Sequence, residues 1–217
     1  MREVSNKIKE FDNSFLSDNI RLIAGIDEAG RGPLAGPVVA AAVIFDRSII
    51  LNGVWDSKKL NEKKRDELFD LINESALSIG VGIIEHDEID QINILQATLK
   101  AMKIAAEKLN PKPHLILIDG NKSFVSNIPT KTIVKGDQKS FAIAAASIIA
   151  KVTRDRIMKQ IALTFPQYNW EKNKGYGTRL HVDAIKEHGF CNYHRVTFLS
   201  KILDGTKQIP IFKKVES

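Results

Sequence analysis

Several kinds of residue that support common chemistries are scarce in this sequence. Cys191 is the only cysteine among 217 residues, which excludes an intrachain disulfide and a cluster of thiolate metal ligands. Such a composition is typical of a reducing compartment, so we expect the protein in the cytoplasm. The five histidines lie near no signature of a serine or cysteine nucleophile, so covalent hydrolytic catalysis is not indicated.

Long apolar segments are missing as well. Residues 1–18 are charged and lack the apolar centre of a secretory signal peptide. The least polar stretch, residues 34–45, is too short to cross a bilayer and contains Pro37. No internal repeat or low-complexity segment stands out. We therefore expect a protein without membrane association.

Negative charge is the scarcer sign in this chain. Lysine and arginine number 32 against 26 acidic residues, which gives a net charge of +6. A basic surplus favours polyanionic partners such as nucleic acids, although many basic proteins bind none. Hydrophobic residues make up 43% of the chain, which predicts a packed core in one domain with a helical extension.

Apolar runs and amphipathic stretches together predict an α/β fold. Strands are expected at 21–26, 38–45, 78–85, 115–118 and 130–134. Helices are expected at 61–72, 89–109 and 140–159, with shorter helical pieces from 165 onward. We take the order to be three strands followed by helix–strand–helix–strand–helix. Tight loops favour antiparallel early strands and helical crossovers favour parallel later ones, which predicts a mixed five-stranded sheet flanked by helices.

Acidic residues stand at the ends of three expected strands. Asp27 and Glu28 end the first, Asp119 ends the fourth, and Asp137 comes shortly after the fifth. If these three strands are neighbours, the four carboxylates converge where α/β sheets usually bind ligands. Clustered carboxylates repel unless cations lie between them, and Mg²⁺ and Mn²⁺ prefer such oxygen ligands. Two such ions, about 3.5–4 Å apart, support phosphodiester cleavage.

A simpler interpretation exists for each acid alone, namely a helix N-cap or a solvated strand end. It is weaker for the adjacent pair Asp27 and Glu28, because their surroundings are apolar and rich in glycine. The glycines of residues 30–36 fit neither the dinucleotide fingerprint nor the P-loop spacing. They do allow backbone amides to approach a substrate closely.

A family resemblance becomes specific at this point. Residues 26–38, IDEAGRGPLAGPV, resemble the signature of the type 2 ribonucleases H. Further matches are DSKKL (56–60), IDG (118–120), KGDQKS (135–140), IAAASIIAKVTRD (143–155), KGYGT (174–178), HG (188–189) and HR (194–195). The resemblance covers about residues 21–203, with the small departure that Thr197 stands where serine is expected. The chain is identified as similar to the bacterial ribonuclease HII family.

The resemblance implies a metal-dependent endonuclease. Such an enzyme cuts duplex DNA at embedded ribonucleotides and degrades the RNA of RNA/DNA hybrids by two-metal-ion catalysis, leaving 5′-phosphate and 3′-hydroxyl ends. Asp27, Glu28, Asp119 and Asp137 match its catalytic set, which binds Mn²⁺ or Mg²⁺. The implied organisation is an N-terminal extension (1–20), a ribonuclease H-like core (21–160), a C-terminal helical portion that grips the duplex (161–205) and a tail (206–217).

Substrate-binding residues are implied in the same way. Gly30, Arg31 and Gly32 match the loop whose backbone reads the ribose 2′-hydroxyl, and Tyr176 matches the aromatic residue that packs on that ribose. Without the resemblance, Tyr176 would pass as half-buried surface. Asp155 is a rival fourth metal ligand, but its helical position favours a paired structural role. The remaining candidates at the substrate are two serines, Ser57 and Ser140, and the basic residues expected to contact phosphates, which are Lys58, Lys59, Lys139, Lys151, Lys174 and Arg195.

Two other functions remain as alternatives. A type 3 ribonuclease H shares the core but carries a sizeable N-terminal domain, and only about twenty residues precede the first strand here. A non-catalytic nucleic-acid-binding protein is disfavoured by the intact acidic set, because metal-free carboxylates oppose phosphate binding.

The tail carries a separate pattern. Gln208, Ile209, Pro210, Ile211 and Phe212 resemble the short peptide with which bacterial replication proteins dock onto the sliding clamp. In the competing interpretation this segment folds back and packs on the body through Phe212. Five-residue patterns of this kind often arise by chance, so the sequence leaves both interpretations open.

Overall fold

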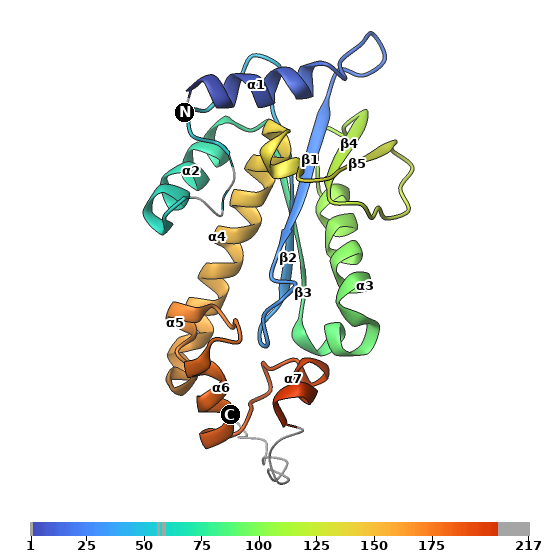
Figure 1. Cartoon of the computed structure of the whole chain (residues 1–217). Coiled ribbons are helices and arrows are strands. Elements are labelled where there is room, and N and C mark those ends of the chain that lie inside the picture. Colours follow the sequence, from blue (N-terminus) through green and yellow to red (C-terminus); the bar gives the residue numbers. More distant parts are fainter. Residues whose placement is uncertain (1, 56, 58–59, 204–217) are drawn as a thin grey trace.

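The computed structural model describes residues 2–55, 57 and 60–203 (Figure 1). The strands are β1 (Ile23–Ala29), β2 (Val38–Ile44), β3 (Ser78–Ile84), β4 (Leu115–Asp119) and β5 (Thr130–Ile133). The α-helices are α1 (Arg2–Asn13), α2 (Glu62–Ser75), α3 (His86–Glu107), α4 (Phe141–Thr164), α5 (Trp170–Asn173), α6 (Arg179–His188) and α7 (Val196–Leu203). The short 3-10 helices used below are η2 (Gly136–Gln138) and η3 (Pro166–Tyr168).

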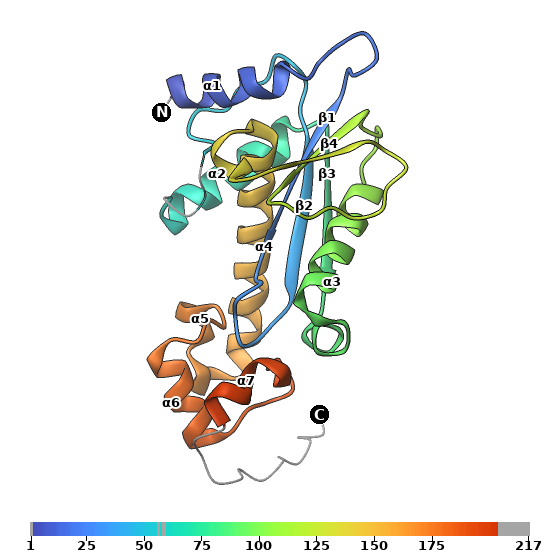
Figure 2. The same cartoon turned by 45° about the vertical axis from the view of Figure 1, so that its right-hand side comes forward.

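The expected mixed five-stranded sheet is confirmed. Its strand order is β3-β2-β1-β4-β5, with β2 antiparallel to both of its neighbours, β1 and β3, with β4 parallel to β1 and with β5 parallel to β4. The first, fourth and fifth strands are therefore neighbours, as convergence of the carboxylates requires. Helix α4 lies on one face of the sheet and α3 on the other (Figures 1 and 2).

Strand β2 explains how both faces are covered. All seven of its residues are buried, because alternate side chains pack toward opposite helices. Ala41 and Val43 belong to the core beneath α4, whereas Ala42 and Ile44 belong to the core beneath α3. Glycine allows one helix to approach still closer, since a Cβ at Gly82 of β3 would lie 2.0 Å from the Ala101 carbonyl oxygen of α3.

Two details of the expected element order are wrong. Helix α2 lies between β2 and β3, so the three early strands are not consecutive. The segment 120–129, which joins β4 to β5, contains no helix even though the two strands are parallel. Strand β1 also continues through Asp27 and Glu28 to Ala29, because Ala29 still pairs with Val39 of β2. These two carboxylates therefore lie within the strand, not after it.

The C-terminal helices gather beyond the far end of α4 (Figures 1 and 2). Their core contains Trp170, Ile185 and Leu199 together with Met158 of α4. Asp90 of α3 accepts hydrogen bonds from the first backbone amides of α7, and the Thr197 hydroxyl donates to the same carboxylate. The expected C-terminal helical portion is thus present, whereas the residue bounds of the four proposed regions stay a prediction. Among the described residues, no helix combines the length and apolar character that a bilayer crossing requires.

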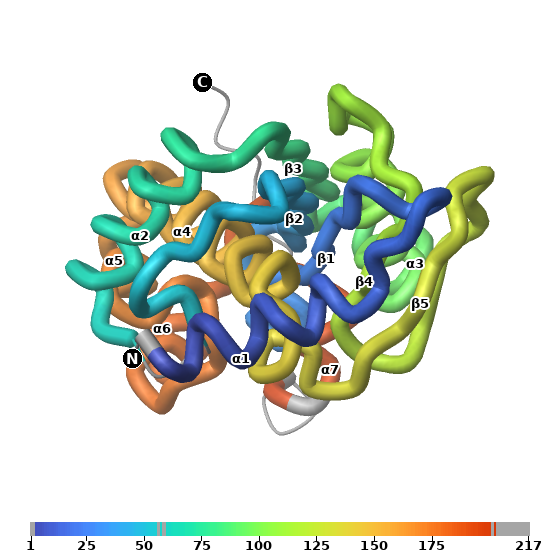
Figure 3. The backbone as a smooth tube through the Cα atoms, turned by 90° about the horizontal axis from the view of Figure 1, so that it is seen from above, coloured from blue at the N-terminus to red at the C-terminus, as the bar shows by residue number. Residues whose placement is uncertain are grey.

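Part of the expected N-terminal extension is a packed helix. Helix α1 lies across the N-terminal end of α4 (Figure 3) and buries Ser5, Ile8, Lys9 and Asp12. The Asp12 carboxylate accepts a hydrogen bond of 2.8 Å from the Ala142 amide in the first turn of α4. Because burial removes this carboxyl from water, the pKa of Asp12 rises from 3.8 to about 6, although the Ser140 hydroxyl opposes the shift.

We expect Asp12→Asn to stabilise the protein at neutral pH. Above pH 6 the folded wild type must hold a buried charge, and well below pH 3.8 the carboxyl is protonated in both states. The wild type therefore loses unfolding free energy as pH rises between these values, whereas the neutral amide does not. The advantage of Asp12→Asn should grow over this window to roughly 1–3 kcal/mol. Urea unfolding at pH 4 and pH 7.5 measures it, and a pH-independent difference would contradict the explanation.

Candidate active site

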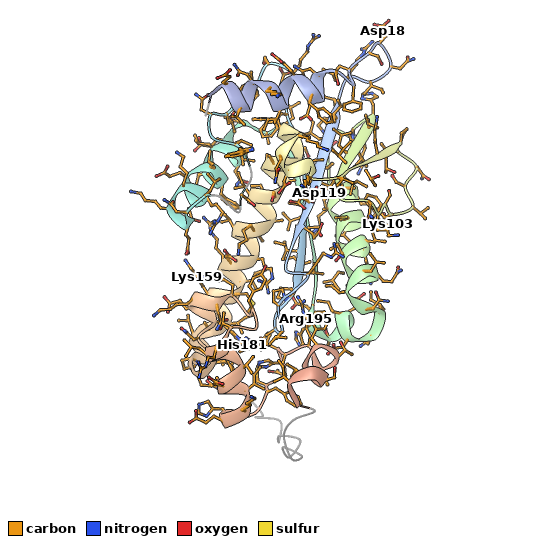
Figure 4. The ribbon with its side chains drawn as sticks, viewed as in Figure 1. Asp18, Lys103, Asp119, Lys159, His181 and Arg195 are labelled. Atoms are coloured by element: carbon orange, nitrogen blue, oxygen red, sulfur yellow. The ribbon has the colours of Figure 1, made fainter. Side chains whose placement is uncertain are left out.

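Asp27 and Asp119 meet on the face of the sheet that α4 covers. Ile26 of β1 pairs with Ile118 of β4, so the next residues of these parallel strands point to the same side. Asp27 is 5% exposed, and Asp119 ends β4 (Figure 4). Glu28 comes next along β1 and is held by Arg31, whose Nη1 lies 3.2 Å from Glu28 Oε1.

The electrostatics show how closely these carboxylates crowd one another. Burial raises the pKa of Asp27 well above its usual value, and the negative charges of Glu28 and Asp119 raise it further. The pKa of Glu28 is raised by burial and by Asp119, against the opposing charge of Arg31. Asp27 and Glu28, whose ionisation is opposed by burial and by the charge of nearby Asp119, form a natural receptor for a cation.

A pair of serines supports Asp27 from beneath. The hydroxyl of Ser147, on α4, forms a hydrogen bond with Asp27 and lies 2.8 Å from the hydroxyl of Ser57. Both serines are buried, so Ser57, expected at the substrate, instead reaches Asp27 through Ser147. Ser147 is not among the residues that the sequence predicts at the site. The available signal was a single hydroxyl within the apolar run 141–150.

The turn that carries Asp137 is tied to the same site. The Gly136 amide donates a hydrogen bond of 2.6 Å to Asp119 Oδ1, and Asp137 itself is 3% exposed within η2. The described residues do not bring three or more acidic, histidine or cysteine side chains into a closed metal-binding group. The donors nevertheless suit a hard divalent cation, because they are all carboxylate oxygens and a cation would relieve their repulsion.

Arg195 holds residues 30–36, the glycine loop, in shape from inside the protein. Its side chain is fully buried, and its guanidinium donates to the carbonyl oxygens of Gly30, Arg31, Pro33 and Gly36 at 2.7–3.1 Å. Burial, together with the nearby charge of Arg154, lowers its pKa to about 9. We expected Arg195 to contact phosphate. The structure instead directs the guanidinium toward the backbone carbonyls of the loop.

Arg154 joins that loop to the segment around Tyr176. Its guanidinium donates to the carbonyl oxygens of Pro37, Ala35 and Lys174 at 2.9–3.0 Å. The fit requires glycine at position 30, where φ is +98° and a Cβ would lie 2.1 Å from Arg154 Nε. This buried arginine was absent from the expected site residues, because nothing in its local sequence distinguishes it from a surface arginine.

Tyr176 stands beside the glycine loop. Its side chain is 42% exposed, and a Cβ at Gly32 would lie 3.9 Å from its ring. The Arg154 guanidinium and the Lys151 ammonium lie 5.8 and 6.0 Å from the ring centroid. Lys151 also forms a 2.6 Å ion pair with Asp155, which agrees with the paired role expected for that acid.

The other residues expected to contact the substrate differ in position. Lys139 is exposed, whereas Ser140 is buried as the N-cap of α4 and accepts from the Ile143 amide at 3.2 Å. Lys174 is only 7% exposed and donates to the Glu171 carbonyl oxygen, so its ammonium is turned inward. Lys58 and Lys59 lie outside the described residues.

Comparison with known proteins decides the family. The family described as Ribonuclease HII matches residues 24–201. The chain belongs to the ribonuclease HII family. Among relatives, the Ribonuclease HII of Acetivibrio thermocellus is 55% identical over 84% of this chain and 72% of its own length. That of Rickettsia bellii is 57% identical over 82% of this chain and 89% of its own length.

Solved structures agree with this family. The ribonuclease H2 from Pyrococcus horikoshii matches with a TM-score of 0.70 at 27% identity, covering 85% of this chain and 98% of that one. The ribonuclease HII in the complex with PCNA from Archaeoglobus fulgidus matches with a TM-score of 0.66 at 26% identity, covering 80% and 93%. The fold is therefore ribonuclease H-like, and the chain is a metal-dependent ribonuclease H, a hydrolase of phosphodiester bonds.

Proposed function

We propose that this ribonuclease HII hydrolyses the phosphodiester at ribonucleotides embedded in duplex DNA, and that it also degrades the RNA of RNA/DNA hybrids. The observation that carries this proposal is the position of Tyr176 against Gly32. Tyr176 and the loop of residues 30–32, the two elements expected to read the 2′-hydroxyl, thereby form one surface, which we call the reading surface. That surface adjoins the strand that carries Asp27 and Glu28.

Recognition would rest on the backbone of the glycine loop. The 2′-hydroxyl both donates and accepts hydrogen bonds, and a loop of residues 30–32 offers amides and carbonyls at close range. Tyr176 adds a flat face for the sugar and a hydroxyl for a further hydrogen bond. Exposed Arg31 and Lys139 are available to phosphates, whereas Arg195 and Lys174 are turned into the protein. A deoxyribose would leave the polar groups of the loop without a partner.

Catalysis would use the four carboxylates Asp27, Glu28, Asp119 and Asp137 as ligands for Mn²⁺ or Mg²⁺. Two ions held there would supply an activated water and stabilise the leaving oxygen, and the products would carry 5′-phosphate and 3′-hydroxyl ends. Ser147 holds the Asp27 carboxylate in place, and the Gly136 amide holds that of Asp119. Arg31 limits the repulsion between Glu28 and its neighbours.

The decisive experiment compares two substrates in parallel. A DNA duplex with one embedded ribonucleotide and an all-RNA/DNA hybrid are digested with Mg²⁺ or Mn²⁺, and the product ends are identified. Cleavage of both, with a 5′-phosphate on the downstream product, supports the proposal. Cleavage of the hybrid alone favours type 3-like specificity. Binding of both without metal-dependent cleavage favours the non-catalytic alternative.

Tyr176→Ala should lose most activity on the single-ribonucleotide duplex. Tyr176→Phe should retain more, because the ring still packs on the ribose although one hydrogen bond, about 0.5–1.5 kcal/mol, is gone. The measurement is kcat/KM on that duplex, with Tyr193→Phe as a matched control outside the reading surface. Equal activity of wild type and Tyr176→Ala would show that Tyr176 does not contribute to the reading surface.

We also propose that the tail docks onto the sliding clamp through Gln208, Ile209, Ile211 and Phe212. These residues lie outside the described part of the chain. Support comes from their resemblance to clamp-docking peptides and from the Archaeoglobus fulgidus relative, whose structure is a complex with PCNA. Tethering would raise the local concentration of enzyme on new DNA. Titration of the host clamp with the full chain and with a chain ending at Gly205 tests this, and equal binding or no binding by both refutes it.

A further inference from the structure

A buried histidine pair lies directly behind Tyr176. His181 of α6 is 0% exposed and His194 is 1% exposed, and their Nε2 atoms are 3.1 Å apart. The second ring nitrogen of His181, Nδ1, lies 2.9 Å from the Tyr176 carbonyl oxygen. Neither histidine contributes to the carboxylate site, so the proposed mechanism leaves both without a role.

The hydrogen-bond partners fix which nitrogen carries each proton. The indole Nε1 of Trp170 can only donate, and it lies 2.9 Å from His181 Nε2, so that nitrogen is an acceptor. The His181 proton is therefore on Nδ1, which donates to the Tyr176 carbonyl. The Cys191 amide donates to His194 Nδ1 at 3.1 Å, so the proton of neutral His194 is on Nε2. That N–H, 3.1 Å from His181 Nε2, shares the single lone pair of that nitrogen with the Trp170 indole.

Both rings are neutral in this arrangement. Burial lowers the pKa of His194 to about 3, with the neighbouring His181 adding to the shift, and burial also lowers the pKa of His181. The hydrogen bonds therefore run in one direction, from the Cys191 amide through His194 and His181 to the Tyr176 carbonyl. A ring whose proton position is fixed by its neighbours is a rigid donor.

The same pair connects Tyr176 with the glycine loop. His194 forms an isolated antiparallel bridge with Ala35, and the Arg195 amide donates to the Leu34 carbonyl at 2.8 Å. The Leu34 amide in turn donates to the Gly175 carbonyl at 2.8 Å. The two elements of the reading surface are thus fastened to one buried network.

We propose that His181 and His194 are positioning residues for ribonucleotide recognition. The chain of hydrogen bonds from the Cys191 amide through the two histidines to the Tyr176 carbonyl, which we call the histidine relay, holds the Tyr176 main chain so that the ring faces the sugar beside Gly32. This inference rests on the proposed function, because it assigns the relay to the ribose-reading role of Tyr176. Neither histidine touches the substrate.

Two substitutions at one position separate the positioning role from general stability. Asn places an amide donor near the site of Nδ1, so His181→Asn keeps the bond to Tyr176 and loses the acceptor for Trp170. His181→Gln places its amide near Nε2 and loses the bond to Tyr176. Each variant breaks one side of a buried network, so we expect comparable losses in Tm.

The activities should differ even where the stabilities do not. On the single-ribonucleotide duplex, kcat/KM of His181→Gln should fall about tenfold or more, since small misplacements of a positioning group cost up to about 100-fold. The kcat/KM of His181→Asn on the same duplex should stay within about threefold of the wild-type value. In a Tyr176→Ala background, His181→Gln should change kcat/KM by less than about twofold, because its effect acts through Tyr176.

Equal losses for the two variants, or the same fold-loss of His181→Gln in both backgrounds, would overturn the relay. If His181→Gln does not fold, the comparison moves to His194, where Gln reproduces the Nε2 donor and Asn does not. Retained activity in His194→Gln with a loss in His194→Asn supports the relay, and the reverse order overturns it. Failure of the proposed function gives a different result. Either the wild type does not cut at the ribonucleotide, or Tyr176→Ala has the same activity as the wild type.

Discussion

Asp27→Asn is expected to abolish metal-dependent cleavage while the protein stays folded. The amide has nearly the same shape, so its contact with Ser147 can persist, but it removes a charged ligand from the site. Metal catalysis contributes several kcal/mol of transition-state stabilisation, and each 1.36 kcal/mol is tenfold in rate, so the loss should reach about 10³-fold or more. Asp119→Asn should behave in the same way.

Two measurements check this result together. Single-turnover cleavage at saturating Mg²⁺ reports the activity, and thermal unfolding without metal reports the fold. Because burial and neighbouring charges oppose ionisation of Asp27, the Tm of the metal-free variant should equal or exceed that of the wild type. Asp66→Asn is the matched control, since the Asp66 side chain is 43% exposed and pairs with Arg156 rather than with the carboxylate site. Near-normal turnover of Asp27→Asn would exclude the assigned site.

Arg195→Lys is expected to destabilise the protein and to impair recognition, although the positive charge is kept. A single ammonium cannot reach the four carbonyl oxygens that the guanidinium fork now joins. The abandoned carbonyls of the loop lose charge-assisted hydrogen bonds, so the unfolding free energy should fall by roughly 3 kcal/mol. A loosened loop no longer presents its backbone to the 2′-hydroxyl, and kcat/KM should fall about 100-fold.

The control for Arg195→Lys is Arg179→Lys. The Arg179 side chain is 95% exposed and its Nε lies 3.7 Å from Asp183 Oδ2, so this variant should match the wild type in urea unfolding and in cleavage. A folded Arg195→Lys protein with full activity on the single-ribonucleotide duplex would show that loop shape does not limit recognition. If Arg195→Lys instead weakens binding equally for all duplexes while the unfolding free energy is unchanged, Arg195 contacts phosphate.

The sequence does not distinguish buried basic residues from exposed ones. Arg195, Lys174 and exposed Lys139 all fall in family motifs and look equivalent in the sequence. Arg195 and Lys174 are buried, because backbone carbonyls offer acceptors at their positions. The carbonyl of Gly30 lies 165 positions from Arg195 along the chain, so no local pattern could indicate the pairing. Ser57 is a similar case, since its partner Ser147 is 90 positions away.

Sequence alone determined the strands, the main helices, the family and the four candidate carboxylates. These follow from local information: apolar periodicity, residues that end strands, and contiguous motifs such as residues 26–38. Only the tertiary structure decided that β4 lies beside β1, which brings Asp119 to Asp27, and that a histidine pair stands behind Tyr176. The physical reason is that a polar side chain can be buried wherever a partner satisfies its hydrogen bonds, and that partner is set by the packing of distant segments.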